Sequence, residues 1–287
     1  MKNILTLLVL FMAFVSCEKP ITSGDDVDTN KAVSPDDNLV VRVPTDGLSS
    51  SRLNFAVYDT DGTRVKQVNQ QIPLSRTASF QLAPQRRSSP PSCAASFQLA
   101  PGSYFLVVVA HSSDGNPTMT NPRKIQFTNA QGFTDTFLYS EYITIADERK
   151  ELNVTPKRIV SLCRFVLTDD YPADVAKMRF YYTGGSGAFD ATTGLGCVNS
   201  RQSQVFNITD GRKTFDLYTF LHDTEGTIRL TVSALDVSDV ELTRREFDVP
   251  MKQNRITSMT GSYFTGSISI SFLTIDTDWD PEYRLTF

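Results

Sequence analysis

Cys17 is the residue whose type and position most clearly indicate chemistry in this chain. It follows a segment that begins with basic Lys2, continues with the apolar stretch Ile4–Val15 and ends with small Ser16. This order is typical of a secretory signal, and the apolar stretch is shorter than the roughly 20 residues that span a bilayer. A cysteine at this point predicts transfer of a diacylglycerol to its thiol and a further acyl chain on its freed amine.

The residues before Cys17, Phe14-Val15-Ser16, resemble the bacterial lipobox, with Phe14 in place of the usual leucine. We therefore expect residues 1–16 to be a signal peptide and Cys17 to be the lipidation site. Two or more acyl chains, palmitate among them, anchor a protein stably, whereas a single chain binds a membrane only marginally. An ordinary signal peptide with a chance cysteine is the alternative.

Other reactive side chains lack the spacing of a catalytic site. His111 and His222 each stand alone, whereas zinc sites show close pairs such as His-Glu-x-x-His, so we expect solvated or capped histidines at strand ends. The run Gly184–Ala188 nearly matches the nucleophile elbow, but Ala188 replaces its last glycine and no strand–turn–helix pattern surrounds it. We interpret it as a glycine-rich loop, and we expect no catalytic residues, no cofactor and no enzymatic activity.

Two groups of carboxylates could attract calcium, which binds clustered oxygen ligands. Asp59, Asp61 and Gly62 are better explained as a hairpin turn, and Asp276, Asp278 and Asp280 alternate along a terminal strand. We expect no metal site, with calcium at the second group as the alternative. Sugar sites on β-sandwiches usually stack exposed aromatics, and Trp279 is the single tryptophan, although ten tyrosines remain available.

The cysteines do not form a disulfide framework. Without Cys17 three remain, Cys93, Cys163 and Cys197, and an odd number leaves at least one free thiol or an intermolecular bond. Cys163 lies in an apolar run that predicts a buried thiol, while a bridge to Cys197 stays open as an alternative.

The composition is that of a folded protein without a nucleic-acid partner. Of the 287 residues 40% are hydrophobic and 21% charged, which allows a sizeable core and two domains of ordinary size. The formal net charge is −4 and no basic run is present, so binding to nucleic acid is not expected.

The elements that must carry these residues are almost all strands. Tyr104–Ala110 is a continuous apolar run typical of a doubly buried strand, whereas Ile228–Ala234 alternates between apolar and polar residues. Similar short segments with turns between them fill the chain, which predicts an all-β protein of two β-sandwiches. The charged stretch Asp147–Pro156 separates two series of strands. We expect a flexible tether over 17–36, an N-terminal β-sandwich over 37–150 and a C-terminal β-sandwich over 151–287.

A seven-residue segment occurs twice, as Ala78–Pro84 and again as Ala95–Pro101. One pair is too few for a solenoid, so a local tandem duplication is the simpler interpretation. The second copy leads directly into the buried strand and is expected to keep the structural place. The surplus, which includes Arg86 and Arg87, is expected to form a surface loop.

Ser267–Phe272 alternates strictly between serine and apolar residues, which predicts a strand with one buried face. Such a strand completes the sheet of its own domain or is offered to another subunit. We favour the self-completing role, because serines opposite an apolar face suit an outer sheet surface.

Several segments together resemble the FimB/Mfa-like fimbrial anchor and minor-subunit lipoproteins of type V pili. They are Leu99–Ser112, Arg158–Leu167, Tyr171–Val175, Tyr182–Gly187, Thr193–Gly194, Phe220–Leu221, Ile228–Val232, Val249–Thr257 and Gly261–Gly266. Together with Cys17, these segments cover most of the mature chain, and their order along it strengthens the resemblance. The lipobox with Phe14 and the duplication depart from the family pattern.

The resemblance implies two transthyretin-like (Greek-key) β-sandwich domains in tandem and no enzymatic activity. It implies fimbrial subunits as partners, joined by β-strand addition to open sheet edges, and a lipid-anchored position at the cell outer membrane, exposed on the surface. A surface glycan-binding lipoprotein of a polysaccharide-uptake system is the alternative. The position in the pilus, the partner subunit and the open edge stay undetermined at this point.

Overall fold

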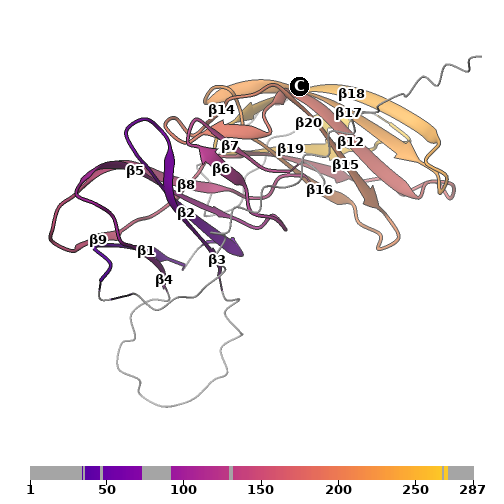
Figure 1. The fold of residues 1–287 in the computed structure, drawn as a ribbon. Helices are drawn as coiled ribbons and strands as arrows, with labels where there is room; N and C mark the ends of the chain where they lie inside the picture. Colours follow the sequence, from indigo (N-terminus) through magenta and orange to yellow (C-terminus); the bar gives the residue numbers. More distant parts are fainter. Residues whose placement is uncertain are drawn as a thin grey trace, which may run out of the picture.

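The computed structural model describes residues 34, 36–45, 48–72, 92–128, 132–266 and 268–270, and these residues form strands and turns without helices. Figure 1 shows the two halves of the chain side by side, with β6 and β7 where they meet. The expected all-β fold of tandem β-sandwiches is confirmed. Among the described residues, no helix has the length and apolar character needed to cross a membrane.

The N-terminal half packs a three-stranded sheet against a five-stranded sheet. The first has the order β4-β1-β9 and the second the order β10-β8-β5-β2-β3. Their strands are β1 (Leu39–Pro44), β2 (Arg52–Tyr58), β3 (Arg64–Gln71), β4 (Ser92–Phe97), β5 (Gly102–His111), β8 (Phe137–Ile145), β9 (Lys150–Asn153) and β10 (Lys157–Arg158). Strand β5 is buried on both faces, as its apolar run predicts: Leu106 and Val108 face one core, and Val107 and Val109 face another.

The C-terminal half packs two four-stranded sheets, with the orders β16-β11-β19-β20 and β15-β12-β17-β18. Their strands are β11 (Ser161–Leu167), β12 (Lys177–Gly185), β15 (Ser200–Asn207), β16 (Thr214–Thr219), β17 (Glu225–Leu235), β18 (Glu241–Lys252), β19 (Ile256–Gly261) and β20 (Ile268–Ile270). The alternation over Ile228–Ala234 places Ile228, Leu230 and Val232 in the core between these sheets.

A fifth sheet contains strands from both halves. Its order is β14-β13-β7-β6, with β6 (Thr118–Asn121), β7 (Lys124–Gln126), β13 (Ala188–Asp190) and β14 (Leu195–Gly196). The halves join where β13 pairs with β7 through Phe189 and Ile125. A buried cluster continues across this junction and includes Phe127 and Phe133 from the first half and Phe220 from the second. The halves therefore share backbone hydrogen bonds and a hydrophobic core.

Strand pairing carries the N-terminal sheets beyond residue 150. β9 pairs in parallel with β1, and β10 pairs with β8, so hydrogen bonds of the first half extend to Arg158. The division into 37–150 and 151–287 stays a proposal, and this pairing favours a boundary after Arg158.

The second copy of the repeated segment is part of the N-terminal sandwich. Ala95, Phe97 and Leu99 are buried, and the Asn38 side chain donates to the Leu99 carbonyl and accepts from the Leu99 amide. The first copy and the loop with Arg86 and Arg87 lie outside the described residues.

Candidate functional site

His111 lies at the end of β5 and is fully buried, so it is not a solvated histidine, but it is capped as the other expected alternative has it, because the Ser113 amide donates to its ring. Its Nε2 lies 2.7 Å from Asn54 Oδ1, and its Nδ1 accepts from the Ser113 amide. Burial and, to a smaller extent, the charge of Arg52 lower the pKa of His111 from its usual value to about 3. The imidazole is therefore neutral with both nitrogens engaged, which is a structural arrangement.

The glycine-rich run does not form a loop. Gly184 and Gly185 close β12 at a bulge, and Gly184 has a φ of +90° beside the Thr227 carbonyl, which excludes a side chain. Ser186 is buried, and its hydroxyl donates to the Ala188 carbonyl and accepts from two amides. His222 donates from Nδ1 to the Gly196 carbonyl at 3.0 Å, and no hydrogen bond joins it to the Ser186 hydroxyl among the described residues, since that hydroxyl is engaged by backbone groups.

The three cysteines in the described part of the chain are free thiols. Cys163 is buried as its apolar run predicts, and burial raises the pKa of its thiol to about 12. It is not bridged to Cys197, so the alternative disulfide is absent from the described structure. Cys17, the expected lipidation site, lies outside the described residues.

Asp59 forms the hairpin turn that its sequence predicts. Its Oδ1 accepts from the amides of Asp61 and Thr63, and Gly62 has a φ of +82°. Within the described ranges, no group of three or more His, Cys, Asp or Glu side chains could hold a metal ion. Asp276, Asp278, Asp280 and Trp279 lie outside these ranges.

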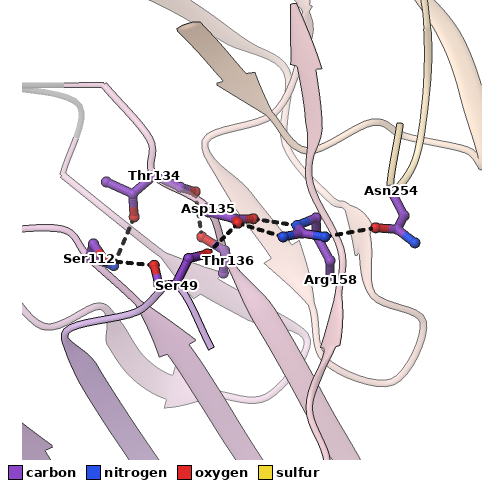
Figure 2. Close-up of polar contacts among 7 residues, drawn as sticks. All are labelled: Ser49, Ser112, Thr134, Asp135, Thr136, Arg158 and Asn254. Atoms are coloured by element: carbon purple, nitrogen blue, oxygen red, sulfur yellow. Dashed lines mark hydrogen bonds and ion pairs between the residues drawn. The ribbon is translucent and has the colours of Figure 1, made fainter. Parts of the chain in front are cut away.

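A buried ion pair links strand β10 to the loop before β8 at the junction of the halves (Figure 2). Arg158 donates from Nε and Nη2 to both oxygens of Asp135, at 2.7 and 2.8 Å, and the side chains are only 5% and 11% exposed. Ser49 donates to Asp135, and Asn254 from the second half accepts from Arg158 at 3.4 Å. Because the pair is bidentate and largely shielded from water, it fixes this loop against β10 in one arrangement.

The free sheet edges are the surfaces where another chain could add a strand. Unpaired backbone groups on an edge are a template for pairing, and proteins usually protect them with charges or proline. Strand β18 is protected in this way, because it carries Arg244, Arg245 and Glu246 and contains Pro250. Its exposed Leu242 lies next to the hairpin that contains exposed Val237 and Val240.

Strand β15 is the less protected edge of the same sheet. It pairs with β12 on one side, and among its eight residues only Arg201 is charged. Val205 is 53% exposed on its outer face. Beneath it Gln202 is buried, and its amide has no hydrogen-bond partner among the described residues. Of these two edges, β15 is the better candidate for strand addition, and nothing in the sequence of β15 alone distinguishes it from a paired strand.

The fold defines the class of protein: an all-β protein of tandem sandwiches whose structural neighbours include adhesins and fimbrial proteins. A candidate adhesin of Bacteroides ovatus has a TM-score of 0.50 and 14% identity, over 77% of this chain and 88% of that one. The fimbrial anchor protein Mfa2 of Porphyromonas gingivalis has a TM-score of 0.41 and 12% identity, over 87% and 99%. The tip fimbrial protein Mfa3 of the same organism has a TM-score of 0.39 and 10% identity, over 80% and 96%.

The likeness to the Bacteroides ovatus protein shows a shared fold. No protein-family model matches the chain, and no curated protein matches it. The resemblance to fimbrial proteins that the sequence indicates is thus confirmed for the fold and its neighbours.

Proposed function

We propose that this chain is a non-enzymatic component of a fimbrium, held at the outer membrane by lipid on Cys17 and joined to other subunits by β-strand addition. The observation that carries the proposal is the fold shared with a candidate adhesin of Bacteroides ovatus. The lipobox-like residues before Cys17 support the anchor, and the weakly protected edge of β15 supports strand addition.

Lipid attachment is tested by Cys17→Ala, with Cys93→Ala as the matched control. Cells fed labelled palmitate should label the natural protein and the Cys93→Ala variant but not the Cys17→Ala variant. The Cys17→Ala protein should also leave the outer-membrane fraction, and fimbriae should detach into the medium. Unchanged membrane fractionation of Cys17→Ala would show that lipid is not the tether.

Strand addition at β15 is tested with lysines, which natural edge strands use against pairing. Ser203→Lys combined with Val205→Lys should prevent incorporation into fimbriae while the purified protein keeps its thermal midpoint. Leu242→Lys on the already protected β18 is the control and should leave incorporation unchanged. If the β15 variant assembles normally, another edge receives the partner. If the β18 variant alone fails, β18 is that edge.

A further inference from the structure

The five-stranded sheet has an open edge along most of β8. Strand β10 pairs only with Phe137 and Leu138, and no other strand of the described structure pairs with β8 on that side. The cause is the path of the chain: β9 belongs to the other sheet, and residues 154–156 cross from β9 to β10. Residues 132–266 are described without a gap, so β8, β9, β10 and the crossing between them all lie inside this range.

Three residues of this edge, Ser140, Tyr142 and Thr144, direct their backbone groups outward. The Ile159 amide donates to the Thr136 carbonyl, so the even-numbered residues on this side of the sheet face β10. The odd-numbered residues of β8 face β5, because the pairing of these two strands has no shift of register. Past the end of β10, the even-numbered backbone groups therefore meet no strand in the described structure.

Tyr142 gives this edge an apolar surface. Its side chain is 69% exposed, and its ring centroid lies 4.7 Å from that of Phe105, which lies 6.5 Å from that of Tyr58. A row of aromatic rings thus crosses the sheet and ends at the open edge with its most exposed member. An exposed apolar side chain on an unpaired strand favours pairing with another chain.

The edge carries little of the charge that usually protects an open strand. Glu141 is the only charged residue of β8, it accepts a hydrogen bond from the Tyr139 hydroxyl, and it points to the opposite face from Tyr142. Lys150 of β9 donates to the Thr144 carbonyl at 3.3 Å. This contact is exposed and long, so a backbone amide of an added strand can replace it.

We propose that a second copy of this chain pairs with this edge, so that two antiparallel β8 strands join the five-stranded sheets of both copies into one sheet. A strand that pairs with its own copy makes an isologous contact, which closes as a two-fold dimer. In the proposed register, Tyr142 lies opposite Tyr142 of the second copy, and Ser140 lies opposite Thr144. All three outward residues of each copy are then paired.

Charge and side-chain packing select this register. A shift that places Tyr142 opposite Ser140 brings Glu141 opposite Glu141 of the second copy, and like charges directly opposite destabilise a sheet. A shift the other way places Ser140 opposite Ala146, which lies outside β8. In the proposed register the two Tyr142 rings are neighbours on one face, so the aromatic row of each copy continues into the other.

The register is tested by cysteine cross-linking. Cys163 is fully buried, so the background chain needs only the replacements Cys17→Ala, Cys93→Ala and Cys197→Ala. Under mild oxidation Tyr142→Cys should form a disulfide-linked dimer. Ser140→Cys and Thr144→Cys should form none when oxidised separately and should link to each other when mixed. If Ser140→Cys links to itself as fully as Tyr142→Cys does, the proposed register is overturned.

The contact itself is tested by sedimentation of chains that carry Cys17→Ala, so that lipid does not hold copies together. The otherwise natural chain should be a dimer whose fraction rises with concentration. Tyr142→Lys should be monomeric at the same concentrations, because two lysines would face each other. A chain that is monomeric at every concentration without this lysine would overturn the proposal.

This inference goes beyond the proposed function, because the contact joins two copies of one chain and does not use β15. The double variant Ser203→Lys with Val205→Lys is therefore the control, and it should keep the dimer. Failure of that variant to enter fimbriae would leave this result unchanged. A dimer that is lost in the β15 variant and kept in Tyr142→Lys would overturn the assignment to β8.

Discussion

His111 makes the stability of this protein depend on pH. Its pKa is about 3 in the folded chain, against an ordinary value near 6.5, because burial disfavours the charged imidazole. The folded state therefore binds fewer protons than the unfolded state between these values. The stabilisation is present above about pH 6.5 and is lost as pH falls toward 3, with a slope of up to about 1.4 kcal/mol per pH unit.

We therefore expect the free energy of unfolding, measured in urea, to decrease steadily below about pH 6.5. His111→Gln should weaken this dependence because the titrating group is gone. His222→Gln is the control, because it removes the other histidine and leaves the buried His111 in place. Equal pH profiles for the natural chain and His111→Gln would contradict the argument.

The Asp135–Arg158 pair should contribute far more than an exposed pair of the same type. Removing one partner of a buried ion pair typically costs about 3–5 kcal/mol because the other charge stays buried. Arg158→Met should show a loss of this order in urea unfolding. Arg164→Met is the matched control: Arg164 pairs with Asp216 in the same bidentate manner, but both side chains are about one-third exposed, so a loss of about 0–1 kcal/mol is expected. Equal losses would show that burial does not decide the difference.

At the scale of elements, the two copies of the repeated segment should differ in importance. Deleting Ala78–Pro84 shortens the expected loop and should change the free energy of unfolding by no more than about 1 kcal/mol. Deleting Ala95–Pro101 removes buried Phe97 and Leu99 and should prevent folding. Circular dichroism and thermal melts of the two purified variants test this. Folding that survives only the second deletion would assign the strand to the first copy.

The sequence predicts the strands well where a single pattern decides them. The apolar run Tyr104–Ala110 and the turn at Asp59–Gly62 appear in the structure as expected. Elsewhere long-range pairing decides the length of a strand: Phe137–Ile145 is the single strand β8 because β5 pairs along its whole length. The Gly184–Gly185 pair, interpreted as part of a loop, instead ends strand β12, because Gly185 pairs with Ser200 of β15 beyond the bulge.

The contacts at the junction could not be predicted from the sequence. Asp135 and Arg158 lie 23 residues apart, and no local pattern indicates that they meet. Likewise, Phe189 carries no signal that it pairs across to Ile125. The scarcity of charges in β15 is visible in the sequence, but it identifies an unprotected sheet edge only once the strand order is known. Cys17 is the opposite case, since its prediction rests on local sequence alone.

At the scale of the whole molecule, the shared sheet and core predict that the two halves unfold together. Phe220 contacts Phe127, Phe133 and Phe189 with ring centroids 6.1, 5.4 and 5.0 Å apart, so its ring joins both halves. Calorimetry of the natural chain should show one transition whose calorimetric and van't Hoff enthalpies agree. Phe220→Ala should lower the free energy of unfolding by about 3–5 kcal/mol and leave a single transition at a lower temperature. Two separated transitions in the natural chain would mean that the halves unfold independently.

The position of β1 has a mechanical consequence. Strand β1 lies at the centre of its sheet, antiparallel to β4 and parallel to β9. When Leu39 is pulled and Asn153 is held in place, the two parallel strands are drawn in opposite directions along their length. This pull therefore loads the hydrogen bonds between β1 and β9 in shear, so that they share the load and do not open one after another. Tension entering through the N-terminus meets the arrangement of strands that resists rupture best, before it reaches the junction.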